Sequence, residues 1–158
     1  MNTPNIGMLV NTRKPGAIKM ARMLLQWGMD KGIAFLFPPH EASVLGVQGV
    51  SDEEWKETVG IALVIGGDGT FLRAARYILG ASILLYGINL GHLGFLASGK
   101  AEEAIQDVES ILRGEYSVQT HRLLDGRISR DGHDTYSLYA LNDLVLAKGA
   151  LARVMHIE

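Results

Sequence analysis

A fully apolar run that ends in glycines constrains the fold of this chain more than any other feature. Residues 61–65 read Ile-Ala-Leu-Val-Ile, and Gly66-Gly67-Asp68-Gly69-Thr70 follows directly. A short aliphatic run without a polar member is typical of a strand buried on both faces, as in a parallel sheet. Residues 71–79 then show a helical pattern. The segment predicts a strand, a glycine loop and a helix, which is the repeating unit of an α/β fold.

The same alternation of strands and helices fills the first two thirds of the chain. The other expected elements are strands at 6–10, 33–37 and 83–88, and helices beginning at Pro15, running from Ser51 to Glu57 and covering 101–112. Pro-Pro and two glycines predict a loop over 38–52. Residues 77–99 carry no charged side chain, but five glycines interrupt them, so we reject a membrane-spanning helix.

The period of the apolar residues changes to two from Tyr116 onward. Strands are predicted at 116–124, 126–130 and 135–148, with Asp-Gly turns at 125–126 and 131–132. We therefore expect a mostly parallel α/β domain over 1–115 and the beginning of an antiparallel β-rich domain over 116–158. The last run alternates without a turn signal, so we expect the chain to end inside a strand.

Charge and cysteine content restrict the partners and the compartment. Fifteen Lys and Arg face 17 Asp and Glu, so there is no broad basic field for nucleic acid. The chain has no cysteine, which suits a reducing compartment, and no secretory signal is visible at its start. We expect a cytoplasmic protein that binds neither nucleic acid nor membrane.

The glycine loop carries the clearest chemistry. Free backbone N–H groups at the start of a helix favour a phosphate group. Asp68 lies among glycines, where a ribose or alcohol can approach it, so it could accept a hydroxyl proton. The alternative is that Asp68 or Thr70 only caps the next helix. The loop lacks the Lys-Ser or Lys-Thr of a P-loop and the dinucleotide fingerprint.

Five further positions are candidates for ligand contacts, each with a structural alternative. Arg73, and less so Arg76, either reaches phosphate oxygens or belongs to a solvated face. Phe95, in the second glycine-rich loop, either stacks on a base or ribose or packs internally. Asn142 and Asp143 interrupt an apolar run, which suits ribose hydroxyls or marks a strand bend. The histidines show no metal-ligand spacing.

Three ordered motifs resemble those of the bacterial NAD kinases. They are Gly-Gly-Asp-Gly-Thr-Phe-Leu-Arg-Ala-Ala-Arg at 66–76, Gly-Ile-Asn-Leu-Gly-His-Leu-Gly-Phe-Leu at 87–96 and Ala-Leu-Asn-Asp at 140–143. The resemblance implies a Rossmann-like domain followed by a β-rich domain, with NAD bound between them. It also implies transfer of the γ-phosphoryl group of ATP, or of polyphosphate, to NAD to give NADP, with Mg²⁺ or a similar cation.

The resemblance also implies roles for individual residues. Asp68 matches the general base that activates the 2′-hydroxyl of the adenosine ribose. The positions that match contacts to NAD or to nucleotide phosphate are Gly69, Arg73, Phe95, Asn142, Asp143 and Arg153. The metal ligands are not assigned, and we expect a homo-oligomer.

Two departures from the family pattern matter. Asn142-Asp143 stands where the family commonly has Asn-Glu, so the acid is shorter by one methylene. A later Thr-Pro-Thr-Gly-Ser-Thr-Ala-Tyr segment, which completes the NAD pocket in the family, does not occur in this sequence. We therefore expect a truncated chain that is inactive alone. The loop by itself also fits a lipid or sugar-phosphate kinase, and the missing segment also fits a non-catalytic nucleotide-binding fragment.

Overall fold

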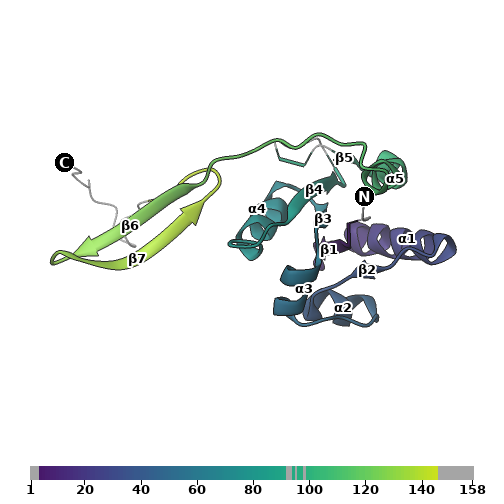
Figure 1. Cartoon of the computed structure of the whole chain (residues 1–158), viewed down its shortest axis with the longest axis horizontal. Coiled ribbons are helices and arrows are strands. Elements are labelled where there is room, and N and C mark those ends of the chain that lie inside the picture. Colours follow the sequence, from purple (N-terminus) through teal and green to yellow (C-terminus); the bar gives the residue numbers. More distant parts are fainter. Residues whose placement is uncertain (1–3, 92–93, 95, 98, 146–158) are drawn as a thin grey trace. The chain divides into compact units, whose positions relative to one another are not determined.

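The computed structural model describes residues 4–91, 94, 96, 97 and 99–145. The chain divides into two compact units, Met1–Val118 and Gln119–Glu158, and each is described here by itself. The elements of the first unit that Figure 1 labels are β1 (Ile6–Val10), α1 (Pro15–Lys31), β2 (Phe35–Leu36), α2 (Pro39–Leu45), α3 (Asp52–Thr58), β3 (Ile61–Gly66), α4 (Asp68–Tyr77), β4 (Leu84–Asn89), β5 (Gly99–Lys100) and α5 (Ala104–Leu112). A short 3-10 helix (Ala101–Glu103) precedes α5. The second unit contains β6 (Leu124–Arg130) and β7 (His133–Ala140).

The first unit is built on a five-stranded sheet in the order β2-β1-β3-β4-β5. All four strand pairs are parallel, and β1 pairs with β3 over the whole length of β1, from Ile6 opposite Ile61 to Val10 opposite Ile65. The chain moves outward from β1 to β2 and then in the other direction from β3 to β5. The order therefore reverses between β1 and β3, and ligands of open α/β sheets bind at such a point, beyond the carboxyl ends of the strands. The predicted mostly parallel α/β fold is confirmed.

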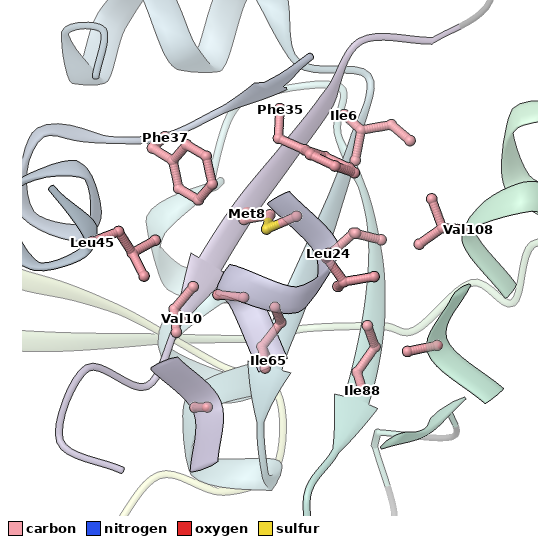
Figure 2. Packing of buried hydrophobic residues seen from close by; sticks show 14 of the residues in the cluster. Ile6, Met8, Val10, Leu24, Phe35, Phe37, Leu45, Ile65, Ile88 and Val108 are labelled. Atoms are coloured by element: carbon pink, nitrogen blue, oxygen red, sulfur yellow. The ribbon is translucent and has the colours of Figure 1, made fainter. Parts of the chain in front are cut away.

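Two apolar layers cover the faces of this sheet. On one face, Leu24 of α1 and Val108 of α5 pack with Met8, Val10 and Ile65, as Figure 2 shows. On the other face, α3 and α4 contribute the buried Trp55 and Ala74. Figure 1 shows α1 and α5 on one side of the sheet strands and α4 on the other. Burying large aliphatic and aromatic side chains on both faces stabilises the sheet that positions the loops at its carboxyl edge.

Close contacts fix the helices on the sheet. The indole of Trp55 donates a hydrogen bond of 3.0 Å to the carbonyl of Leu36, and a side chain at Gly7 would collide with the indole ring. The Tyr86 hydroxyl, on β4, donates a hydrogen bond of 2.5 Å to Asp107 of α5. Burial, and then the bond to Asp107, raise the pKa of Tyr86 above its ordinary value.

Several predicted boundaries in the first unit are correct and one element is wrong. The Ser51 hydroxyl accepts a hydrogen bond from the Glu54 N–H, which confirms it as the cap of α3. The loop predicted over 38–52 instead contains α2, seven residues long, with Pro39 as its first residue and Gly46 as its left-handed end at φ 73°. Proline at a first helical position and glycine after the last one favour a helix, so the signal was present in the sequence.

The second unit is an antiparallel hairpin, and the structure corrects two of its predicted strands. The predicted turn at Asp131-Gly132 is confirmed by φ values of 54° and 77°. The other predicted turn, Asp125-Gly126, lies inside β6, where Gly126 leaves room for the side chain of Leu144.

The strand predicted at 116–124 is wrong, and the one predicted at 135–148 is confirmed over 135–140 but wrong over the remaining described residues, 141–145. Residues 116–123 are irregular, and β7 ends at Ala140, with a bend at Leu141 and Asn142. Alternation in the sequence does not produce a strand without a neighbouring strand to pair with, and the polar pair after Leu141 has low strand propensity.

Candidate functional site

The loops at the carboxyl ends of β1, β3 and β4 are bonded to one another at the point where the strand order reverses. The N–H of Asn11, after β1, donates to the Ile65 carbonyl at 2.9 Å, and its side-chain amide donates to the Thr70 hydroxyl at 3.2 Å. The Leu90 N–H, after β4, donates to the Gly66 carbonyl at 3.1 Å. These bonds hold the loops that follow β1 and β4 against the glycine loop that follows β3.

The half-buried Asp68 lies at the junction of the two glycine-rich loops. It is the first residue of α4, and Gly67 is the residue that caps the helix, without a side-chain hydrogen bond. One Asp68 carboxylate oxygen accepts hydrogen bonds from the backbone N–H groups of Leu96, at 3.2 Å, and Ala97, at 3.4 Å. The proposal that Asp68 only caps α4 is therefore not what the structure shows. Its carboxylate is oriented by the second loop.

Different physical reasons explain why glycine occupies each position of the first loop. A side chain at Gly66 would collide with the buried Thr70, with its Cβ 2.7 Å from that of Thr70. A side chain at Gly67 or Gly69 would meet no atom within 4 Å. Neither of these two has a left-handed φ that would require glycine. The open space beside them, next to Asp68 and a helix start, suits a bound phosphate or ribose.

The glycine at position 94 brings the backbone of the second loop against the catalytic candidate. A Cβ at Gly94 would collide with the Asp68 carboxylate, approaching to 2.6 Å from its carboxyl carbon. Sequence reasoning placed both loops at one edge, but it did not identify this contact. Only a glycine allows such a close approach of backbone to carboxylate.

Arg73 occupies a position that connects three elements. Its guanidinium, from α4, donates a hydrogen bond of 2.8 Å to the carbonyl of Val10 at the end of β1, and lies 3.1 Å from the Glu41 carboxylate of α2. The Glu41 side chain is 5% exposed and that of Arg73 is 50% exposed. The sequence analysis missed Glu41 because it assigned this segment to a loop. An acidic residue in the first turn after Pro39 was the available signal.

A cavity of about 340 Å³ lies beside this ion pair. Its walls include Leu9, Pro38, Asp52, Arg73 and Tyr77. The Tyr77 hydroxyl donates to Asp52 at 2.6 Å, and burial, followed by that bond, raises the pKa of Tyr77 above its ordinary value. The lining of the cavity therefore includes two carboxylates, those of Glu41 and Asp52, and one arginine, Arg73.

A family model that describes the ATP-NAD kinase N-terminal domain matches residues 6–116. The chain belongs to the NAD kinase family. It is 34% identical to the NAD kinase of Symbiobacterium thermophilum over 98% of its own length and 56% of that protein. It is 36% identical to the NAD kinase of Geobacter metallireducens over 97% of its own length and 54% of that protein. The chain thus spans about half the length of these relatives.

A solved structure supports the fold assignment. The crystal structure of yeast NADH kinase complexed with NADH has a TM-score of 0.76 and is 12% identical, covering 89% of this chain and 46% of the yeast chain. At this identity the likeness shows the fold, and the family assignment rests on the sequence matches.

The remaining positions matched to the NAD kinase motifs divide between the two units. Asp68, Gly69 and Arg73 lie together on the first two turns of α4. Asn142 and Asp143 are exposed and follow β7 in the second unit. Asn142 lies at the bend, as the alternative of a strand bend predicted. Phe95 and Arg153 lie outside the described residues.

The described residues contain neither a cluster of metal-ligating side chains nor a membrane-spanning helix. Among them, no three His, Cys, Asp or Glu side chains are grouped so that they could hold a metal ion. No helix in the described ranges is long and apolar enough to cross a membrane.

The ion pair of Arg73 leads to a testable prediction. We expect Arg73→Ala to weaken nucleotide binding and to destabilise the fold by about 1–3 kcal/mol, because it leaves the buried Glu41 carboxylate without this partner. Arg76→Ala, one turn later on α4 and exposed, should change both quantities far less. Urea unfolding and nucleotide titration of the two variants test this. Equal, small effects would show that Arg73 belongs to an ordinary solvated face.

Proposed function

We propose that the natural protein transfers the γ-phosphoryl group of ATP, or of polyphosphate, to the 2′-hydroxyl of the adenosine ribose of NAD, giving NADP. The observation that carries the proposal is the Asp68 carboxylate, held by two backbone N–H groups beside glycines with open space. It lies at the switch point of an α/β sheet in a chain of the NAD kinase family.

The proposed step needs one base and a positioned phosphate. The Asp68 carboxylate accepts the proton of the ribose 2′-hydroxyl as the hydroxyl oxygen attacks the γ-phosphorus. A new O–P bond forms, the bond from the γ-phosphorus to the β–γ bridging oxygen breaks, and ADP leaves with the bridging electrons. Backbone N–H groups at the start of α4 stabilise charge on the phosphoryl oxygens.

The residues present fit a divalent cation held mainly by substrate. Mg²⁺ keeps several waters and is bound through one or two carboxylates together with phosphate oxygens, so it requires no cage of protein ligands. Asp68 is the carboxylate that would approach it in the described part of the chain. The ion would neutralise charge on the transferred group.

The remaining proposals follow the family. We propose that Gly69, Arg73, Phe95, Asn142, Asp143 and Arg153 contact NAD or nucleotide phosphate. For Arg73, the two intramolecular bonds leave half of the side chain accessible for such a contact. We also propose a cytoplasmic homo-oligomer. Residues 1–158 alone should not turn over NAD, because positioning supplies much of a kinase's rate and the chain spans about half of its relatives' length.

An acceptor comparison tests the proposal. Initial rates of the natural full-length protein would be measured with ATP and Mg²⁺ and with NAD, a sugar phosphate or a lipid alcohol as acceptor, with residues 1–158 assayed beside it. We expect the full-length protein to phosphorylate NAD and neither of the other two acceptors. Faster phosphorylation of the sugar phosphate or the lipid would assign the loop to another kinase class.

A further inference from the structure

The start of the chain carries an unbalanced set of positive charges. Arg13, Lys14, Lys19 and Arg22 fall within the first 29 residues, which contain no Asp or Glu. All four side chains are exposed, and none forms a salt bridge with another described residue. An ordinary solvated face mixes both signs of charge, so four cations without an acid indicate a surface that meets negative charge.

Three of these cations line a single hollow, here called the basic groove. Its volume is about 340 Å³, and it is lined by Thr12, Arg13, Pro15, Ile18, Lys19 and Arg22. The four helical members are spaced at i, i+3, i+4 and i+7, so they share one face of α1. Pro15 and Ile18 are its apolar lining residues, and the three cations are its charged ones.

Hydrogen bonds connect the basic groove to the glycine loop. The Arg13 N–H donates to the Asn11 side-chain oxygen at 3.2 Å, and the Lys14 N–H donates to the Asn11 carbonyl at 3.0 Å. The Asn11 amide in turn donates to Thr70, two residues after Asp68. The groove thus begins at the β1 side of the switch point, and the glycine loop occupies the β3 side.

The cavity beside Arg73 is a poorer site for a polyanion. Its arginine, Arg73, is paired with Glu41, and Asp52 adds a second carboxylate to the wall. A chain of phosphates would meet negatively charged side chains there, whereas every charged side chain that lines the basic groove is positive.

We propose that the basic groove binds the phosphate chain of the phosphoryl donor. Arg13, Lys19 and Arg22 hold the phosphates distal to the reacting one, while the glycine loop holds the reacting phosphoryl group beside Asp68. Arginine and lysine form charge-assisted hydrogen bonds with phosphate oxygens, and arginine forms them in pairs. This inference rests on the proposed function, since it assigns the donor to a kinase site. ATP and inorganic polyphosphate share the chemistry.

The test compares two variants of the full-length protein. One is the double substitution Lys19→Ala with Arg22→Ala, and the control is Lys31→Ala, which removes an exposed cation at the far end of the same helix. Calorimetric titrations with ATP, inorganic tripolyphosphate and NAD would be run at two salt concentrations. We expect the double variant to bind the phosphate chain roughly tenfold to hundredfold more weakly, with a smaller salt dependence. NAD binding and the control should be unchanged.

The outcomes separate the sources and the two proposals. Weaker binding of ATP and tripolyphosphate together supports a site for the phosphate chain, and weaker binding of only one identifies that molecule as the donor held there. Unchanged binding of both, or no binding of either by the unaltered protein, overturns the inference. A full-length protein that loses phosphate binding as expected but never phosphorylates NAD would contradict the proposed function alone.

Discussion

In the natural full-length protein, Asp68→Asn should lower kcat for NAD phosphorylation by about two to four orders of magnitude, the range expected for losing a positioned general base. Asparagine has nearly the same shape, and its carbonyl oxygen can still accept the N–H groups of Leu96 and Ala97, so the second loop stays in place. The substitution removes the charge and the proton acceptor. KM for NAD should therefore change much less than kcat.

The control for this substitution is Asp30→Asn. Asp30 is an exposed acid near the end of α1 that accepts a hydrogen bond from Gln26, so its loss should not affect the reaction. Steady-state kinetics with varied NAD measure both variants. A kcat of the Asp68→Asn variant near that of the unaltered protein would limit Asp68 to holding the second loop.

Gly94→Ala should reduce kcat by roughly tenfold to a thousandfold, because displacing a reacting group by about 1 Å can cost about a hundredfold. The new Cβ would collide with the Asp68 carboxylate, so either the carboxylate rotates or the loop that carries its two N–H donors moves. Both movements displace the Asp68 carboxylate or its hydrogen-bond donors, whereas the hydrophobic core on the two faces of the sheet is unchanged. The midpoint of thermal unfolding should change little.

Gly91→Ala is the matched control in the same loop. A Cβ at this exposed glycine meets no atom within 4 Å, and its φ is not left-handed. Steady-state kinetics and thermal unfolding should be measured for both variants. We expect the two to differ in kcat and to have the same unfolding midpoint. If Gly94→Ala were as active as Gly91→Ala, the close approach of the loop to Asp68 would have no part in the reaction.

The sequence predicted those parts of the fold that depend on local signals. The apolar run at 61–65, followed by glycines, predicted β3 and the helix after it, and Ser51 predicted the start of α3. The Asp131-Gly132 turn was equally local, since both residues adopt positive φ. Burial patterns and turn chemistry act within a few residues, so they can be predicted without knowing the neighbours.

The contacts that build the candidate site are long-range and could not be predicted in this way. Arg73 bonds to Val10 and Glu41, which are 63 and 32 residues away, and Asp68 accepts its two hydrogen bonds across 28 and 29 residues. The pattern placed two glycine-rich loops at one edge of the sheet. Which atoms met there depended on the strand order and on a helix, α2, that the sequence analysis had assigned to a loop.

Following the transferred phosphoryl group tests the proposed reaction most directly. The full-length protein would be incubated with ATP labelled with ³²P at the γ position, Mg²⁺ and NAD, and the products would be separated and identified with an NADP-specific dehydrogenase. We predict one label in NADP for each NAD converted, and loss of that label in the Asp68→Asn variant. Label that accumulates only in inorganic phosphate, or that reaches NADP equally in the variant, would contradict the central claim.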